Sequence, residues 1–139
     1  MDDDHLDDSL RLAVMRLARR MRLERGINDL RDHQLSVLFT LLREGAMSVG
    51  KLGEVERISA PSITRTVNVM VKSGYLKRSA DKEDGRIVVV EVTGAGRAAA
   101  LEARRRRAMW FSEALRGLTE VERRSLHSAS EILQRLANS

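Results

Sequence analysis

Arg65, Asn68 and Lys72 follow one another at short intervals along one segment of the chain. Their side chains can donate hydrogen bonds to base edges or pair with phosphate charges. Their spacing of three and then four residues places them on one face of a helix. An Arg guanidinium can bind guanine O6 and N7, and an Asn amide can pair with adenine. Pro61 and Ser62 lie on this face near its N-terminal end, and they are small enough to let it approach base edges closely. The same pattern is also typical of a solvated helix face, so the neighbouring elements must decide between the two interpretations.

An apolar face on the other side predicts that residues 60–73 form this helix. Ser59 is a candidate N-cap, and Pro61 stands in the first turn, where its missing N–H costs nothing. Gly74 suits the left-handed position after the helix ends, and Thr64 lies on a flank between the two faces. The side expected to face a core consists of Ile63, Val67, Met70 and Val71.

Two strand-like runs follow at residues 75–79 and 87–93, joined by a charged tip that contains glycine. The acidic residues of the tip cannot touch phosphate themselves. Asp84 can instead hold Arg86 by a charge-assisted hydrogen bond and aim its guanidinium at a narrow minor groove. Arg78 in the first strand is a further candidate for DNA contact. Alone, this pattern also fits an ordinary polar turn with an ion pair of little consequence.

A shorter helix is predicted before the first one, at residues 48–55, with Ser48 as its N-cap and Leu52 and Val55 on its apolar edge. The order is therefore helix, turn, helix and β-hairpin. In a helix-turn-helix with a wing, the second helix enters a DNA major groove and a basic ribbon lies beside it. The remaining helices are predicted at residues 6–25, 32–43, 95–116 and 119–137.

Several short motifs between residues 30 and 101 are specific in combination. They are Leu30-x-x-x-Gln34-x-x-Val37-Leu38, Leu52, Pro61-Ser62-Ile63-Thr64-Arg65, Gly74-Tyr75-Leu76-x-Arg78, Asp81-x-x-Asp84-x-Arg86 and Val92-Thr93-x-x-Gly96. This combination resembles the MarR-type winged-helix transcriptional regulators. Arg31 stands where such proteins often have Thr or Ser before the second helix, so we expect the cap to shift to Asp32.

The resemblance implies a mainly α (α+β) fold, with a winged helix-turn-helix core and dimerisation helices at both ends. Residues 1–139 would form a single domain, with the DNA-binding lobe at 30–93 and the dimerisation helices at 6–25 and 95–137. It also implies a homodimeric transcriptional regulator, a repressor, that binds a pseudo-palindromic operator in double-stranded DNA.

Length and composition agree with such a regulator. A chain of 139 residues is large enough for one core but too small for a separate sensor domain. The net charge of +5 and the pI near 10.4 suit a polyanionic partner. No run approaches the roughly 18 apolar residues of a membrane span, and the acidic start is unlike a signal peptide, so we expect a cytoplasmic protein without a membrane partner.

Residues that would supply catalysis or metal binding are scarce. The absence of cysteine excludes thiol-based oxidant sensing, and His5, His33 and His127 lie far apart in sequence without a metal-binding motif. No phosphate loop, nucleophile elbow or carboxylate pair is present. We therefore expect no cofactor, no metal and no enzymatic activity.

The segments at the two ends carry apolar faces that need partners. The first helix has one apolar stripe and a weaker second one, and a Thr119-x-x-Glu122 capping box precedes the broad apolar face of the last helix. A dimerisation layer is the economical explanation. The first stripe is Leu6, Leu10, Ala13, Val14, Leu17, Ala18 and Met21, and the last face is Val121, Leu126, Ala129, Ile132, Leu133 and Leu136.

The run Arg104-Arg105-Arg106-Arg107 looks at first like a nucleic-acid tract. Four consecutive helical residues sweep most of the way round the axis, however, and cannot form one contact face. We expect solvated positions and ion-pair partners instead. Trp110 and Phe111 are the most apolar part of the same helix, and a core or dimer-seam role is favoured for them over a ligand pocket.

The resemblance further implies that a small aromatic acid or phenolic effector relieves repression. We place its pocket between the first, second and fifth helices, where Arg16 could meet a carboxylate. Met15, Phe39, Leu42 and Trp110 could enclose the ring, although plain core packing is the commoner role for such residues.

Two other classes of function remain open on the sequence alone. A winged helix can serve as a protein-interaction adaptor, in which case the Arg65 and Arg86 surfaces would contact an acidic partner. Binding would then not depend on DNA sequence. An enzyme is the remote third class.

Overall fold

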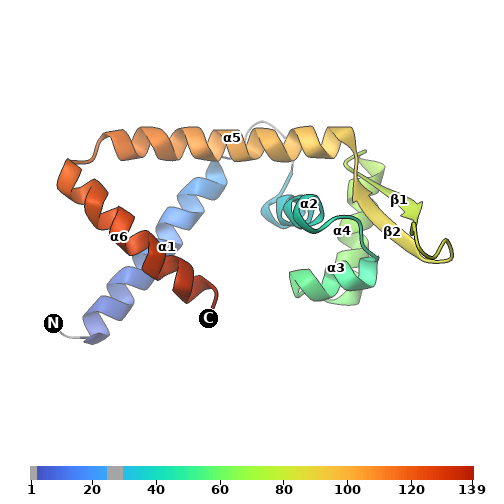
Figure 1. The fold of residues 1–139 in the computed structure, drawn as a ribbon, viewed down its shortest axis with the longest axis horizontal. Helices are drawn as coiled ribbons and strands as arrows, with labels where there is room; N and C mark the ends of the chain where they lie inside the picture. The colour runs from blue at the N-terminus through green and yellow to red at the C-terminus, as the bar shows by residue number, and fades with distance from the viewer. Residues whose placement is uncertain (1–2, 25–29) are drawn as a thin grey trace. The chain divides into compact units, whose positions relative to one another are not determined.

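The computed structural model describes residues 3–24 and 30–139 of the chain, with six helices and one two-stranded sheet within those ranges (Figure 1). In chain order the elements are α1 (Asp3–Leu23), α2 (Asp32–Glu44), α3 (Val49–Glu56), α4 (Ala60–Lys72), β1 (Leu76–Ala80), β2 (Val88–Val92), α5 (Gly94–Arg116) and α6 (Glu120–Ala137). The mainly α fold with a small wing is confirmed. Each boundary lies within three residues of the predicted one.

The chain divides into two compact units, which we describe separately. One unit comprises Arg25–Arg105 and holds α2, α3, α4, the sheet and the first half of α5. The other comprises Met1–Glu24 and Arg106–Ser139 and holds α1, the second half of α5 and α6. No described helix is both long enough and apolar enough to cross a membrane.

The first unit, which we call the winged-helix unit, is built around one apolar core. The predicted inward face of α4 supplies Ile63, Val67 and Met70, each no more than 1% exposed, while Val71 is half-buried against the same core. The other members of the core are Leu30, Leu35, Val37, Leu38, Leu41, Leu52, Leu76, Val90, Ala99, Ala100 and Ala103.

The ends of the helices in this unit follow from local side-chain chemistry. The Ser48 hydroxyl accepts a hydrogen bond from the Lys51 amide at 3.1 Å and caps α3, as predicted. Gly74 follows the end of α4 with φ of 86°, a left-handed value that glycine adopts without strain. The expected shift of the α2 cap to Asp32 is wrong. Arg31 holds the N-cap position with extended backbone, and its amide donates to the Gln34 side chain at 2.9 Å.

The sheet is an antiparallel hairpin in which Leu76 pairs with Val92 and Ala80 pairs with Val88. Met47, in the loop before α3, adds an isolated bridge to Val90. The wing is thereby attached to the helix-turn-helix by backbone hydrogen bonds as well as by the core.

The junction between the wing and α5 is tightly bonded. The Thr93 hydroxyl donates to the Gly74 carbonyl at 2.5 Å and accepts from the Gly96 amide at 3.1 Å. The Thr93 amide donates to the Tyr75 carbonyl at 3.1 Å. A side chain at Gly96 would collide with that same carbonyl and would reach Val92 Cγ1 at 2.9 Å. The Val-Thr-x-x-Gly motif is therefore a requirement of close backbone packing.

The second unit, which we call the helical unit, leaves much apolar surface uncovered. No residue of α6 is buried in the described chain, although the Thr119 and Glu122 capping box forms as predicted. Trp110 of α5 is half-buried and packs under the guanidinium of Arg20 of α1, 4.9 Å from the ring centroid. The Phe111 ring lies 6.2 Å from that of Trp110.

Candidate nucleic-acid interface

Helix α4 presents a polar face opposite its buried face. Arg65, Asn68 and Lys72 are exposed, and so are Pro61 and Thr64. Ser62 is half-buried beside them. Side chains whose chemistry could read base edges are thus accessible along α4, while core residues fix the helix from behind.

Ser59 occupies the N-cap position of α4, as predicted, but its hydroxyl makes no capping hydrogen bond in the described structure. Its backbone is extended, and Pro61 stands within the first turn. The first-turn amides of α4 are therefore not capped by Ser59. Amides at a helix N-terminus can bind a phosphate oxygen.

Val69 introduces an apolar group into this polar face. Its side chain is 48% exposed, and it follows Ser62 by seven residues and Arg65 by four, which places all three on one side of α4. An aliphatic side chain in this position can contact the C5-methyl group of thymine. The sequence pattern shows Val69 on this face, but we did not predict it as a DNA-binding residue.

The wing tip holds Arg86 in the geometry expected from the sequence. Arg86 Nε donates to Asp84 Oδ1 at 3.0 Å, and its Nη2 donates to Oδ2 at 3.1 Å. The Arg86 amide also donates to Asp84 Oδ1 at 3.1 Å. The Arg86 side chain nevertheless remains 91% exposed. A two-point contact of this kind orients a guanidinium while leaving it accessible to a polyanion.

The charges of this pair reinforce one another. The hydrogen bonds from the Arg86 side chain, and then from its amide, lower the pKa of Asp84 below its usual value. The carboxylate correspondingly raises the pKa of Arg86. Both groups are therefore charged at any pH near neutrality, so titration does not break the contact under those conditions.

Arg78 lies on β1 and connects the wing to the exposed face of α4. Its Nη2 donates a hydrogen bond to Asn68 Oδ1. We predicted both residues as DNA contacts but not their contact with each other, because they are ten residues apart and belong to different elements. Two groups expected to act separately are thus joined.

A second contact that the sequence pattern did not reveal joins the helix-turn-helix to α2. The Glu56 carboxylate, at the end of α3, accepts hydrogen bonds from Ser36 Oγ at 2.8 Å and from Thr40 Oγ1, both on α2. Thr40 is only 4% exposed. Glu56 therefore satisfies a buried hydroxyl and fixes the end of α3 against α2, immediately before the turn into α4.

Two arginines of the run on α5 make contacts within the protein. Arg105 pairs with Glu102 through two hydrogen bonds, at 3.0 and 2.8 Å, and Arg104 covers the ring of Phe39 with its guanidinium 5.1 Å from the centroid. The expected ion pairing is confirmed for Arg105.

The residues predicted to hold an effector are divided between the two units. Met15, Arg16 and Trp110 belong to the helical unit, and Phe39 and Leu42 belong to the winged-helix unit. Met15 is 57% exposed and Arg16 is exposed, whereas Phe39 and Leu42 are half-buried against the core. No contact within either unit tests their role, so the pocket stays a prediction.

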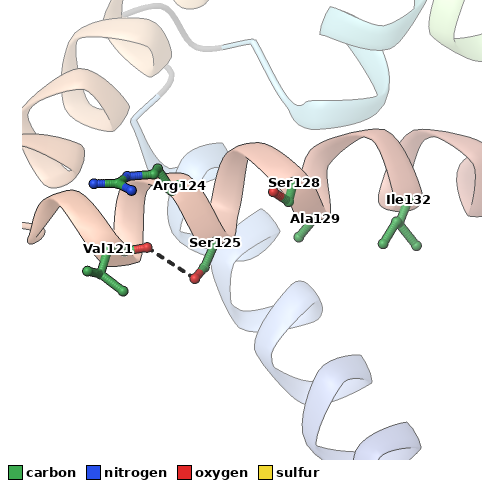
Figure 2. A pocket seen from close by; sticks show the side chains of 6 residues that line it. All are labelled: Val121, Arg124, Ser125, Ser128, Ala129 and Ile132. Carbon is green, nitrogen blue, oxygen red and sulfur yellow. Dashed lines mark hydrogen bonds between the residues drawn. The ribbon is translucent and has the colours of Figure 1, made fainter.

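A groove of about 550 Å³ lies elsewhere, along α6 (Figure 2). Its lining residues are Val121, Arg124, Ser125, Ser128, Ala129 and Ile132. None of the predicted effector residues lines this groove. All of its lining residues come from α6, so the groove is an open face of that helix. Among the residues that the structure describes, no group of three His, Asp or Glu side chains is placed to hold a metal ion.

Comparison with known proteins agrees with this geometry. The MarR family model matches residues 30–88. An HTH-type transcriptional regulator of Mycobacterium bovis, Mb0904, is 38% identical over 136 residues, which is 98% of this chain and 95% of that protein. A crystal structure of a Pseudomonas aeruginosa PA01 protein, described as a transcriptional regulator, superposes with a TM-score of 0.88 at 28% identity and covers 100% of this chain and 99% of its own. The structure of a MarR family protein from Bacillus stearothermophilus superposes with a TM-score of 0.83 at 20% identity, and the match covers 100% of this chain and 99% of that one.

The fold and the exposed face of α4 define a winged helix-turn-helix protein of the DNA-binding type. The chain belongs to the MarR family. Regulators of this family bind DNA, act as dimers and are transcription factors rather than enzymes. Family membership therefore favours DNA binding over the adaptor function that the sequence alone left open.

Proposed function

We propose that this protein is a homodimeric, sequence-specific repressor that binds a pseudo-palindromic operator and acts as one domain over residues 1–139. Helix α4 enters the major groove and the wing lies over the adjacent minor groove. The observation that supports this most directly is the accessible polar face of α4 beside a wing whose Arg86 is pre-oriented by Asp84.

The proposed contacts divide by chemistry. Arg65 and Asn68 are the base-reading groups, and Arg86 enters the minor groove. The polar groups at and near the start of α4, together with Lys72 and Arg78, are expected to lie against the sugar-phosphate backbone or to support the readers. In full, the proposed DNA-binding residues are Ser59, Pro61, Ser62, Thr64, Arg65, Asn68, Lys72, Arg78, Asp84 and Arg86.

Exposed apolar surface supports the homodimer. Among the described residues, fourteen of the seventeen large exposed apolar side chains lie on α1, α5 and α6. An apolar helix face of this extent is typical of an interface rather than of a monomer surface. A two-fold dimer would hold two α4 helices about 34–36 Å apart, which matches successive major grooves on one side of DNA.

The test of this function is selective binding to DNA. We would enrich the preferred duplex from a random library, then measure its affinity in the presence of excess random DNA. Arg65→Ala should reduce affinity for the enriched duplex by about 1–3 kcal/mol and relax one base preference while the fold survives. An equal loss on random DNA would assign Arg65 to phosphate, and failure to enrich any sequence would favour the adaptor.

We also propose that a small aromatic acid or phenol relieves repression by binding near Arg16. The dimer would have two conformations that differ in the separation of its two α4 helices. A ligand that binds one conformation more tightly than the other shifts the equilibrium toward it. Calorimetry with salicylate, on the wild type and on Arg16→Ala, tests this. Binding that weakens operator affinity in the wild type and fades in the variant supports the pocket. A constitutive DNA-binding protein is the better interpretation if no aromatic acid binds.

A further inference from the structure

The hydrogen bond between Arg78 and Asn68 has a definite direction. A guanidinium carries only N–H donors, so the atom of the Asn68 side chain that faces it must be the carbonyl oxygen. The opposite orientation would place the amide N–H groups against other donors. The contact therefore fixes which end of the amide is oxygen and leaves the Nδ2 group directed away from Arg78.

The backbone explains why Arg78 reaches α4. Alternate residues of a strand face opposite sides, so Arg78 shares a side of the hairpin with Leu76 and with its cross-strand partner Val90. Leu76 and Val90 are buried in the core, at 2% and 0% exposed. The neighbouring Lys77 faces the other side and pairs across the strands with Glu91 at 3.2 Å.

We propose that Arg78 is a positioning residue for base reading, which holds the Asn68 amide so that its nitrogen, and not its oxygen, meets the DNA. Asn68 then acts as a hydrogen-bond donor to an acceptor in the major groove, such as a purine N7, guanine O6 or thymine O4. The proposal rests on the function proposed above. It replaces the separate roles that the sequence suggested for the two residues.

The test compares four variants on the enriched duplex and on all single-base changes of it. Arg78→Ala and Asn68→Ala should relax preference at the same base pair, each by roughly three- to tenfold. The double variant should lose no more than Asn68→Ala alone, because residues that act through one contact are not additive. Asn68→Asp keeps the acceptor for Arg78 but lacks the donor, so it should lose the same preference.

Lys77→Ala is the matched control, since it removes the same charge from the adjacent position on the other side of the hairpin. The affinity of Arg78→Ala for DNA should depend on salt concentration in the same way as that of Lys77→Ala. A phosphate contact by Arg78 would instead lower affinity on every sequence and reduce the salt slope by about 0.9. Such a phosphate-like effect of Arg78→Ala would overturn the proposal. So would a double variant whose loss of base preference equals the product of the two single losses, or an Asn68→Asp variant that keeps the full base preference.

A measurement on the free protein separates this inference from the proposed function. In nitrogen-15 relaxation, the Asn68 side-chain amide should be ordered in the wild type and in Lys77→Ala and mobile in Arg78→Ala. An amide that is equally mobile in all three refutes the positioning contact, whatever the DNA experiments give. An ordered amide in a protein that enriches no sequence refutes the proposed function, and the base-reading role with it.

Discussion

Gly96→Ala offers a direct test of how the wing is joined to α5. The added methyl group would collide with the Tyr75 carbonyl oxygen and approach Val92 Cγ1 at 2.9 Å. Both neighbours are constrained, because the carbonyl accepts a hydrogen bond from the Thr93 amide and Val92 belongs to β2. The collision can be relieved only by displacing the hairpin from the start of the helix.

Two opposing terms set the size of the effect. Overpacking of this kind costs about 1–3 kcal/mol, and more where backbone has to move. Replacing glycine by alanine within a helix contributes up to about 1 kcal/mol in the opposite direction. Because the collision is with backbone, we expect the steric cost to lie in the upper part of this range or above it. After the helix contribution is subtracted, the free energy of unfolding should fall by about 1–3 kcal/mol. For a chain of this length, that lowers Tm by roughly 3–10 °C.

Thermal unfolding followed by circular dichroism, at one fixed protein concentration, measures this change. Gly94→Ala is the matched control, since it lies two residues earlier in α5 and an added Cβ there meets no atom within 4 Å. We expect the control to unfold at or slightly above the wild-type temperature. If Gly96→Ala were as stable as Gly94→Ala, close packing would not be the reason for this glycine.

Three further outcomes are expected. Arg86→Ala should weaken binding to every DNA sequence and reduce the salt slope by about 0.9, and Asp84→Ala should weaken binding less. The pKa of Asp84 is lowered below 3.8, so the contact with Arg86 is lost only as the pH falls through that lowered pKa. DNA binding measured between pH 5 and 8 should therefore show no step from this pair. Leu133→Glu should give a monomer or an unfolded chain by light scattering, since it places an unpaired carboxylate in the proposed interface at a cost of several kcal/mol, while Gln134→Glu should remain dimeric. Glu56→Ala should lower the free energy of unfolding by about 1–3 kcal/mol in denaturant titrations because it leaves the buried Thr40 hydroxyl unpaired, whereas removing the exposed Glu54 carboxylate should have little effect.

Features encoded by nearby residues were predictable from the sequence. The two faces of α4 follow from a 3.6-residue period, and the Asp84–Arg86 contact spans only two residues of a tight tip. The caps at Ser48 and Thr119 are likewise local. In each case the chain geometry that brings the partners together is fixed by one element, so spacing alone determines the contact.

Contacts between elements were not predictable in the same way. Glu56 reaches residues that precede it by 20 and 16 positions, and the pairing depends on how α3 packs against α2. A carboxylate at the end of a short helix has many possible partners in the sequence. Only the packed structure identifies Ser36 and Thr40 among them.

The Arg78–Asn68 contact shows what this difference means for function. From spacing alone, an exposed Asn on a recognition helix offers both a donor and an acceptor, and an exposed Arg on a wing offers a charge. Packing of β1 against α4 joins the two and commits the acceptor to the protein. Specificity in this site would then depend on a residue that need not touch a base. A substitution in the wing could accordingly change which sequence α4 prefers without altering α4 itself.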